Sequence, residues 1–375
     1  MNNFTIKEIP AGSYFSEPVY LDEHFILTAP ELNFTAELLK TLQTWEFKEI
    51  NSDGEPQEEY SGEEALANEG STEKSILSDG TEFQEAEKFY REFIKYVKNL
   101  FTNIILKKDI NFNQIATRIR ELCDVIRENR RNLLRVMKND DSEGQNYLAS
   151  HSVKSTAIAV IIGTYIKLPP HRLLELGVAA LLHEAGMIQF PPQIFLSNQP
   201  LNNEDRKLIL SHPIIGYNML KNLHFPLVVN LAALEHHERE NGTGYPQKLT
   251  GEKISLYAKI IAVACSYEAL TNERPHKDAK DGYSGMLDLL KNEGKQYDDT
   301  VVKALVFSLS IYPIGLYVLL SNGKKGQVVD VNPENPKYPM VQVFGEINPD
   351  GKNKVIETSQ DGISIARPLQ KEEIS

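Results

Sequence analysis

The sequence has few of the features that mark a secreted or membrane protein. Its 375 residues include only two cysteines, Cys123 and Cys265, which excludes a disulfide framework and favours a reducing compartment. No run approaches the ~20 consecutive apolar residues that a membrane span requires. The N-terminal stretch from Met1 to Pro10 lacks a basic segment followed by an apolar one, so we expect no signal peptide there. These absences predict a cytoplasmic protein with no membrane partner.

Basic residues are scarce relative to acidic ones, with 40 lysines and arginines against 52 aspartates and glutamates and a net charge of −12. General nucleic-acid binding is driven by clustered positive charge, so this balance argues against that function. Residues 51–80 hold nine acidic residues and one lysine, with almost no apolar periodicity. Because such a segment cannot bury enough apolar surface to order itself, we predict a poorly packed acidic linker over 51–80.

The rest of the chain is long enough for two or three domains of ~150 residues. Residues 1–50 carry short apolar segments between turn residues and one amphipathic stretch, which predicts a small α/β module. Residues 81–140 repeat apolar residues at steps of three and four, which predicts a pair of long helices. We expect this pair to pack against the central domain or against a second copy of the chain.

The two C-terminal segments differ in the pattern of their apolar residues. Residues 141–310 continue the helical pattern with interruptions at prolines, which predicts a helical bundle. Residues 311–375 contain β-rich runs at Tyr317–Leu320, Gln327–Val331 and Met340–Phe344, separated by turn residues, and predict a small antiparallel β extension. The expected fold class is therefore mainly α, with a small N-terminal α/β module and a small C-terminal β tail.

Histidines gather in the central region. Five of the nine lie there in apolar-flanked helical contexts: His151, His183, His212, His236 and His237. Each interval between the separate motifs is about one helix plus a turn, so a bundle can bring all five to one point between its helices. Neutral imidazole is a common ligand of transition metals, and a carboxylate beside a histidine, as at Glu184, can bridge two ions. The set predicts a metal site.

The alternative is that each histidine only fills space or lies at the surface, which is the commoner situation for any one histidine. Two adjacent histidines followed by an acid, at His236, His237 and Glu238, are hard to explain as packing. Buried imidazoles lose solvation unless their nitrogens are bonded. The set as a whole therefore favours ligands over packing.

Short motifs surround these histidines in a fixed order. They are His151-Ser152, Leu182-His183-Glu184-Ala185-Gly186, Ser211-His212-Pro213, His236-His237-Glu238-Arg239-Glu240-Asn241-Gly242-Thr243-Gly244-Tyr245-Pro246 and Arg274-Pro275-His276-Lys277. The series, which covers about 130 residues, resembles the motifs of the HD-GYP family of cyclic di-GMP phosphodiesterases. The eleven-residue motif is the most distinctive and matches that family almost without change.

The resemblance implies an HD-type helical bundle that holds one or two divalent ions, iron or manganese in the first place and zinc as the alternative. It implies hydrolysis of cyclic di-GMP, or a related nucleotide, to the linear dinucleotide or GMP. His183 and Glu184 would be the catalytic doublet. The implied metal ligands are His151, His183, Glu184, His212, His236, His237 and Cys265. The implied substrate-binding residues are Arg239, Gly244, Tyr245, Pro246, Arg274 and Lys277.

Three positions depart from the family pattern. Glu184 replaces the aspartate of the doublet, and its extra methylene moves the carboxylate outward by roughly one bond length. Met187 replaces a lysine, which removes a positive charge that would face the scissile phosphate. Cys265 stands in place of an aspartate ligand; a thiolate holds zinc or iron, although a cysteine in an apolar helix is also often packing.

Two functions of different classes therefore remain open. In the first, the chain is a phosphodiesterase with full or reduced activity. In the second, it is an inactive cyclic di-GMP-binding, sensor or scaffold protein whose flanking modules contact a signalling partner. A third possibility, a phosphohydrolase of the wider HD superfamily acting on another nucleotide, is disfavoured by the intact loop from Gly242 to Pro246.

Overall fold

The computed structural model of the chain describes residues 2–10, 13–15, 19–20, 26–28, 34, 39, 42, 49–57, 81–108, 110–138, 147–191, 194, 202–272, 281–332, 334–348, 353–369 and 373. The chain divides into two compact units, Met1–Ser75 and Ile76–Ser375. Among the helices described, none is long and apolar enough to cross a membrane.

The N-terminal unit is a small β-rich module. Its strands are β1 (Asn2–Thr5), β2 (Tyr14–Phe15), β3 (Val19–Tyr20), β4 (Ile26–Thr28), β5 (Glu49–Ser52) and β6 (Pro56–Gln57), with the 3-10 turn η1 (Ile6–Glu8) after β1. The sheet order is β1-β5-β3-β4, and β2 pairs with β6 separately. Ile6, Phe15, Val19 and Ile50 are among the residues of its apolar core.

The linker predicted over residues 51–80 begins too early. Residues 49–52 form β5, which is antiparallel to β1 and β3, and residues 56–57 form β6. Ser52 is fully buried. Backbone pairing does not depend on an apolar side chain, so a polar segment can complete a sheet that the apolar pattern does not reveal. The remainder of the predicted linker, residues 58–80, lies outside the described residues.

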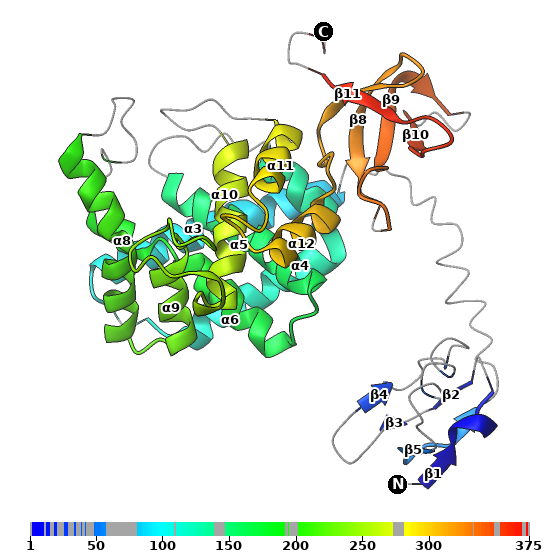
Figure 1. Cartoon of the computed structure of the whole chain (residues 1–375), viewed down its shortest axis with the longest axis horizontal. Coiled ribbons are helices and arrows are strands. Elements are labelled where there is room, and N and C mark those ends of the chain that lie inside the picture. The colour runs from blue at the N-terminus through cyan, green and yellow to red at the C-terminus, as the bar shows by residue number, and fades with distance from the viewer. Residues whose placement is uncertain are drawn as a thin grey trace. The chain divides into compact units, whose positions relative to one another are not determined.

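The second unit begins with the predicted helical pair, which is confirmed as α3 (Thr81–Ile105) and α4 (Phe112–Lys138). Their apolar stripes face each other and the rest of the bundle, with Phe93, Val97 and Ile119 fully buried. Non-helical backbone at Asn129 kinks α4, and the Asn129 side chain donates to the carbonyl of Glu82 at 2.8 Å. The pair contacts α5 and α6, so it belongs to the bundle (Figure 1).

The remaining helical elements are α5 (Tyr147–Tyr165), α6 (Pro170–Leu182), η3 (Ala185–Gln189), α8 (Asn203–Asn222), α9 (Leu227–Glu235), η4 (Gly251–Lys253), α10 (Leu256–Thr271), α11 (Gly282–Lys291) and α12 (Asp299–Leu309). Figure 1 shows α5 and α10 in the middle of this group. Both helices are apolar nearly all round and accordingly buried. Side-chain caps fix several starts, since Asn202, Ser255, Asp281 and Asp298 accept hydrogen bonds from the first-turn amides.

The C-terminal extension is one antiparallel sheet in the order β10-β9-β8-β7-β11. Its strands are β7 (Tyr317–Leu320), β8 (Lys325–Asp330), β9 (Met340–Ile347), β10 (Asn353–Glu357) and β11 (Ile365–Pro368). The three predicted runs are confirmed as β7, β8 and β9. Strands β10 and β11 were not predicted, because they lie at the two edges of the sheet and carry mostly exposed or half-buried side chains.

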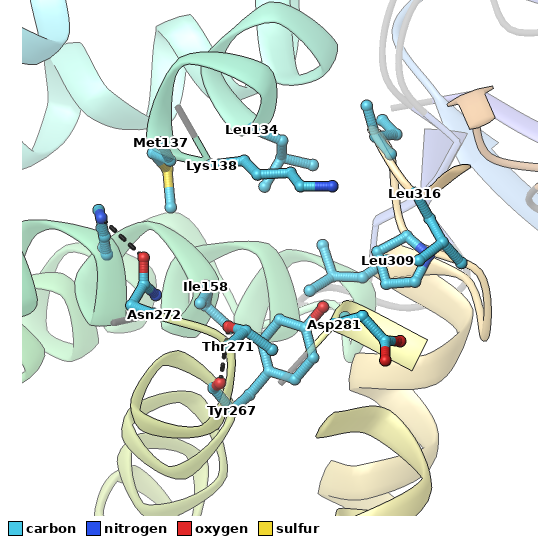
Figure 2. Close-up of a pocket in the computed structure, with 14 residues that line it drawn as sticks. Leu134, Met137, Lys138, Ile158, Tyr267, Thr271, Asn272, Asp281, Leu309 and Leu316 are labelled. Atoms are coloured by element: carbon cyan, nitrogen blue, oxygen red, sulfur yellow. Dashed lines mark hydrogen bonds between the residues drawn. The ribbon is translucent and has the colours of Figure 1, made fainter. Parts of the chain in front are cut away.

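A cavity of about 120 Å³ lies where this extension begins, between α4, α5, α10 and residues 309–316. Figure 2 shows Lys138 reaching across it from α4. Its Nζ donates to the carbonyl of Gly315 at 2.6 Å, and burial lowers the pKa of this ammonium group. Gly315 has a φ of +85°, a conformation that favours glycine. The hydrogen bond from Lys138 therefore joins a turn that favours glycine, at the start of the C-terminal extension, to helix α4.

Candidate metal centre

Helix ends orient two of the histidines. His183 directly follows α6 and its Nδ1 lies 2.6 Å from the carbonyl oxygen of Ala180. His236 directly follows α9, with Nδ1 2.9 Å from the carbonyl oxygen of Ala233. The last carbonyl groups of a helix have no intrahelical donor. Since a carbonyl only accepts, each Nδ1 carries a proton, and in the neutral ring each Nε2 then keeps a free lone pair.

His212 reaches the same state through Pro213. Proline has no backbone N–H, so within α8 the carbonyl of Ile209 loses the donor that residue 213 would otherwise provide. The Nδ1 of His212 lies 2.5 Å from that carbonyl oxygen and replaces the missing donor. The His-Pro sequence therefore fixes the tautomer of His212 and turns its Nε2 toward the centre of the bundle.

His151 is held by the side chain of Glu268, a contact that was not predicted from the sequence. His151 lies on α5, and its Nδ1 makes a short hydrogen bond with Oε2 of Glu268 on α10. Both side chains are buried. Its Nε2 faces Sγ of Cys265 at 3.5 Å. The detectable signal was an acid three residues after Cys265 in an otherwise apolar helix, which places both on one helix face.

Replacing Glu268 by glutamine tests this orienting role. Hydrogen-bond partners of metal-binding histidines typically account for about 10- to 100-fold in metal affinity. We expect Glu268→Gln to lower metal affinity by that factor without unfolding the protein, as measured by competition with a chelating dye. Replacing the exposed Glu204 on α8 by glutamine is the control and should leave affinity unchanged. Equal affinity in both variants would refute the role.

Glu184 lies between the two groups of histidines. Its Oε1 is 3.7 Å from Nε2 of His151 and 3.7 Å from Nε2 of His183. Its Oε2 is 3.4 Å from Nε2 of His212. The cluster thus contains two sets of four donors that share this carboxylate, and the ligand atoms of each set lie within 4.8 Å of one another. The first set is His151, His183, Glu184 and Cys265, and the second is Glu184, His212, His236 and His237.

The rings are close enough to serve one centre. Neighbouring histidine ring centroids are separated by 4.1 Å for His236 and His237 and by 5.4 Å for His151 and His183. The separations from His212 to His236 and to His237 are 5.2 Å and 5.0 Å. These values are far below the ~10 Å beyond which a shared binuclear site would be impossible. The structure therefore brings together the histidines that the sequence predicted would converge.

The electrostatics favour a bound cation. Burial alone would raise the pKa of Glu184, but the neighbouring histidines His212, His183 and His151 outweigh it and hold the pKa at about 2. Burial would also raise the pKa of the Cys265 thiol, yet contacts with His151 and His183 lower it to about 6. Burial and the adjacent histidines keep the pKa values of His236 and His237 well below 6.5. The cluster therefore offers two neutral imidazoles, those of His236 and His237, together with anionic oxygen and sulfur, all of which suit metal binding.

His151 retains a proton at the place where a metal ion is expected to bind. Burial opposes protonation of His151, but Glu268 and Cys265 raise its pKa well above 6.5. Within the described residues, two buried atoms of the cluster, Nε2 of His183 and Oε2 of Glu184, have no hydrogen-bond partner. A buried polar atom without a partner costs roughly 1–3 kcal/mol. A divalent ion would displace the proton and satisfy both atoms, so the residues fit a metal site.

The motif loop after His237 folds back over the cluster. A Cβ at Gly244 would lie 2.5 Å from His237 O, Glu238 Cα and Arg239 N, so only glycine permits this approach. The ring of Tyr245 stacks on His237 with centroids 4.6 Å apart. Glu238 holds the far side of the loop by accepting from the amides of Gln247 and Leu249 at 2.6 and 2.9 Å.

The predicted substrate-binding residues divide into two groups. Arg239, Gly244, Tyr245 and Pro246 lie on this loop beside the cluster. The Arg239 guanidinium donates to the carbonyl of Glu238 at 2.8 Å and lies over the ring of Tyr297, 5.1 Å from its centroid. It is therefore anchored on one side while remaining half-buried. Arg274 and Lys277 lie outside the described residues.

The structure gives Met187 a packing role. The motif resemblance implies a lysine at this position that would face the substrate. Its side chain is 7% exposed and packs in an apolar cluster with Phe190 and Ile194. A lysine here would have to leave that cluster or bury its ammonium group.

We therefore expect Met187→Lys to destabilise the protein by about 1–3 kcal/mol, because a buried polar group without partners costs that much. Met187→Leu, which nearly conserves volume, should cost less than about 1.5 kcal/mol. Urea unfolding of both variants measures the difference. If the lysine variant is as stable as the leucine variant and gains turnover, position 187 faces the substrate after all.

Comparison with known proteins identifies the family of the chain. The family model for the HD domain matches residues 99–301, more than half of the chain. PdeB, a cyclic di-GMP phosphodiesterase of Borreliella burgdorferi, is 30% identical over 196 residues, which cover 52% of this chain and 52% of that protein. A cyclic di-GMP phosphodiesterase of Pseudomonas aeruginosa is 33% identical over 214 residues, covering 56% of this chain and 51% of that protein. The chain thus spans about half the length of these relatives.

A solved structure supports the fold. Bd1817, an HDG"Y"P protein from Bdellovibrio bacteriovorus, matches with a TM-score of 0.51 and 17% sequence identity, covering 81% of this chain and 97% of that chain. The mainly α, HD-type fold predicted from the sequence is confirmed, and so is the resemblance to HD-GYP proteins. With the family model covering residues 99–301, the chain belongs to the HD domain family.

Proposed function

We propose that the protein is a metal-dependent phosphodiesterase that hydrolyses cyclic di-GMP to the linear dinucleotide or GMP. The observation that carries the proposal is the pair of four-donor sets that share Glu184 beside the Gly244-Tyr245-Pro246 loop. The relatives named as cyclic di-GMP phosphodiesterases support the choice of substrate. They are matched over about half their length, so the substrate of the whole protein is part of the proposal.

We assign the ligand roles to His151, His183, Glu184, His212, His236, His237 and Cys265. The ions would be iron or manganese, with zinc as the alternative. When bound, such a pair supplies Lewis-acid chemistry, because it acidifies a shared water molecule and neutralises charge on the phosphoryl oxygens. The protein's own contribution is to hold six donors and one shared carboxylate in place through the backbone and side-chain hydrogen bonds described above.

The loop would position the substrate. The ring of Tyr245, which stacks on His237 and is half-buried, is the proposed contact for a guanine base. The guanidinium groups of Arg239 and Arg274 and the ammonium of Lys277 are the proposed phosphate contacts, because planar guanidinium groups bind phosphate oxygens in pairs. Gly244 and Pro246 shape the turn that brings Tyr245 into position.

A second candidate is an inactive protein that binds cyclic di-GMP as a sensor or scaffold. It is favoured by one specific feature, the apolar side chain of Met187 packed where the resemblance implies a lysine that faces the phosphate. Loss of that cation would weaken stabilisation of the transition state while leaving ligand binding possible.

One experiment separates the two functions. The full chain, purified without oxygen and supplied with Mn²⁺ or Fe²⁺, is incubated with cyclic di-GMP, and the products are resolved by chromatography. The phosphodiesterase function predicts the linear dinucleotide or GMP, and no product from a His236→Asn variant. Binding of intact cyclic di-GMP in calorimetry without any product would favour the sensor, and neither binding nor turnover would reject both.

A further inference from the structure

The two donor sets differ in chemistry. The set of His212, His236, His237 and Glu184 supplies nitrogen and oxygen only. The set of His151, His183, Cys265 and Glu184 adds a sulfur donor. Sulfur is a soft ligand that favours zinc-class ions, whereas imidazole and carboxylate donors without sulfur also suit iron and manganese. The two halves of the centre therefore have different preferences among metals.

The sulfur is placed as a ligand would be. Around a tetrahedral zinc ion, sulfur at about 2.3 Å and imidazole nitrogen at about 2.05 Å stand about 3.5 Å apart. The distance from Sγ of Cys265 to Nε2 of His151 is 3.5 Å. Glu268, one helical turn after Cys265 on α10, holds the same imidazole by its other nitrogen. Because Cys265 and Glu268 both lie on α10, this helix fixes the thiol of Cys265 relative to the imidazole of His151.

Apolar packing does not explain the polar surroundings of the Cys265 thiol. Cys265 is buried, with 8% of its surface exposed. The three residues that share its donor set, His151, His183 and Glu184, are all titratable side chains. A cysteine that served only as a small apolar residue would be expected to face apolar side chains instead.

We propose that the centre is built for two unlike metals: the half-site with Cys265 prefers a thiophilic ion of the zinc class, and the three-histidine half-site is the one open to iron or manganese. This inference rests on the proposed binuclear centre. Glu184 joins the two half-sites, so the ion bound through Cys265 would chiefly hold the centre together. The three-histidine half-site, beside Tyr245, would be the half closer to the substrate.

Cobalt provides the test, because cobalt bound to a thiolate absorbs in the near ultraviolet by charge transfer in addition to its visible bands. The metal-free full chain is titrated with Co²⁺ without oxygen. We expect the charge-transfer band in the wild type and its complete loss in Cys265→Ser. The control is Cys123→Ser, which should keep the band because the half-buried Cys123 belongs to neither donor set. One equivalent of Zn²⁺ added to the cobalt-loaded protein should then remove the charge-transfer band before the visible bands.

The outcomes distinguish this inference from the function on which it rests. Cobalt binding without a charge-transfer band, or loss of the visible bands first on adding zinc, would overturn the inference and leave the metal centre standing. Absence of any cobalt binding would reject the centre itself. If Cys265→Ser does not fold, X-ray absorption of the zinc-loaded wild type decides, since the inference requires one sulfur at about 2.3 Å from zinc.

Discussion

Replacing Glu184 by glutamine is expected to reduce hydrolysis of cyclic di-GMP at least about a thousandfold. Two metal ions contribute several kcal/mol to the transition state, and each 1.36 kcal/mol corresponds to a factor of ten in rate. Glu184 reaches both donor sets, with Oε1 3.7 Å from His151 and Oε2 3.4 Å from His212. The neutral amide keeps the shape but removes the shared negative charge, so the two ions would repel each other without a bridge.

Two controls sharpen this result. Glu184→Asp restores the acid that the motif resemblance implies and should keep measurable activity. Glu204→Gln removes an exposed carboxylate outside the cluster and should match the wild type. Activity in Glu184→Gln within tenfold of the wild type would mean that the carboxylate does not bridge the reacting metals.

Removal of the metals is expected to lower the stability of the folded protein by about 4 kcal/mol. A ligand present at a thousand times its dissociation constant stabilises the native state by about that amount. For a domain of this size the loss corresponds to roughly 10 °C in the thermal midpoint. The reason is local: without cations the cluster buries Oε2 of an ionised Glu184 and Nε2 of His183, neither of which has a hydrogen-bond partner among the described residues. Differential scanning calorimetry before and after dialysis against a chelator measures the change.

The same dialysis should lower the midpoint of Glu184→Gln by less than that of the wild type, because the variant has lost the shared ligand and would hold at most one ion. Re-addition of Zn²⁺ and Mn²⁺ to the wild type should restore the midpoint. A chelated wild type that melts at the original temperature would show that the donors are satisfied by one another rather than by metal.

The histidine cluster could be predicted from sequence because its signal is discrete. His183, His212 and the pair His236-His237 each lie in a short motif, and an α bundle with helix-length intervals has few ways to keep such groups apart. The presence of α3 and α4 and of the first three strands of the C-terminal sheet could likewise be predicted, because their apolar residues repeat with the period of the element.

Other features could not be predicted from the sequence, and the physical reason differs from one feature to the next. Glu268 was missed because a single acid in a helix is usually at the surface, and only the fold brings it to His151. The packing of Met187 was not predicted, because a missing charge in a motif does not reveal what the replacement side chain packs against. Strands β5 and β6 continue into a polar segment because backbone hydrogen bonds, not side chains, hold them. The ligand roles themselves stay predictions.

Metal content tests most directly whether two bound ions share Glu184. The full chain is purified without oxygen, supplied with Mn²⁺ and Zn²⁺, freed of loose metal and measured by elemental analysis beside Glu184→Gln. We predict about two equivalents per chain in the wild type and at most one in the variant. A wild type without bound metal, or a variant that still holds two ions, would contradict this sharing of Glu184.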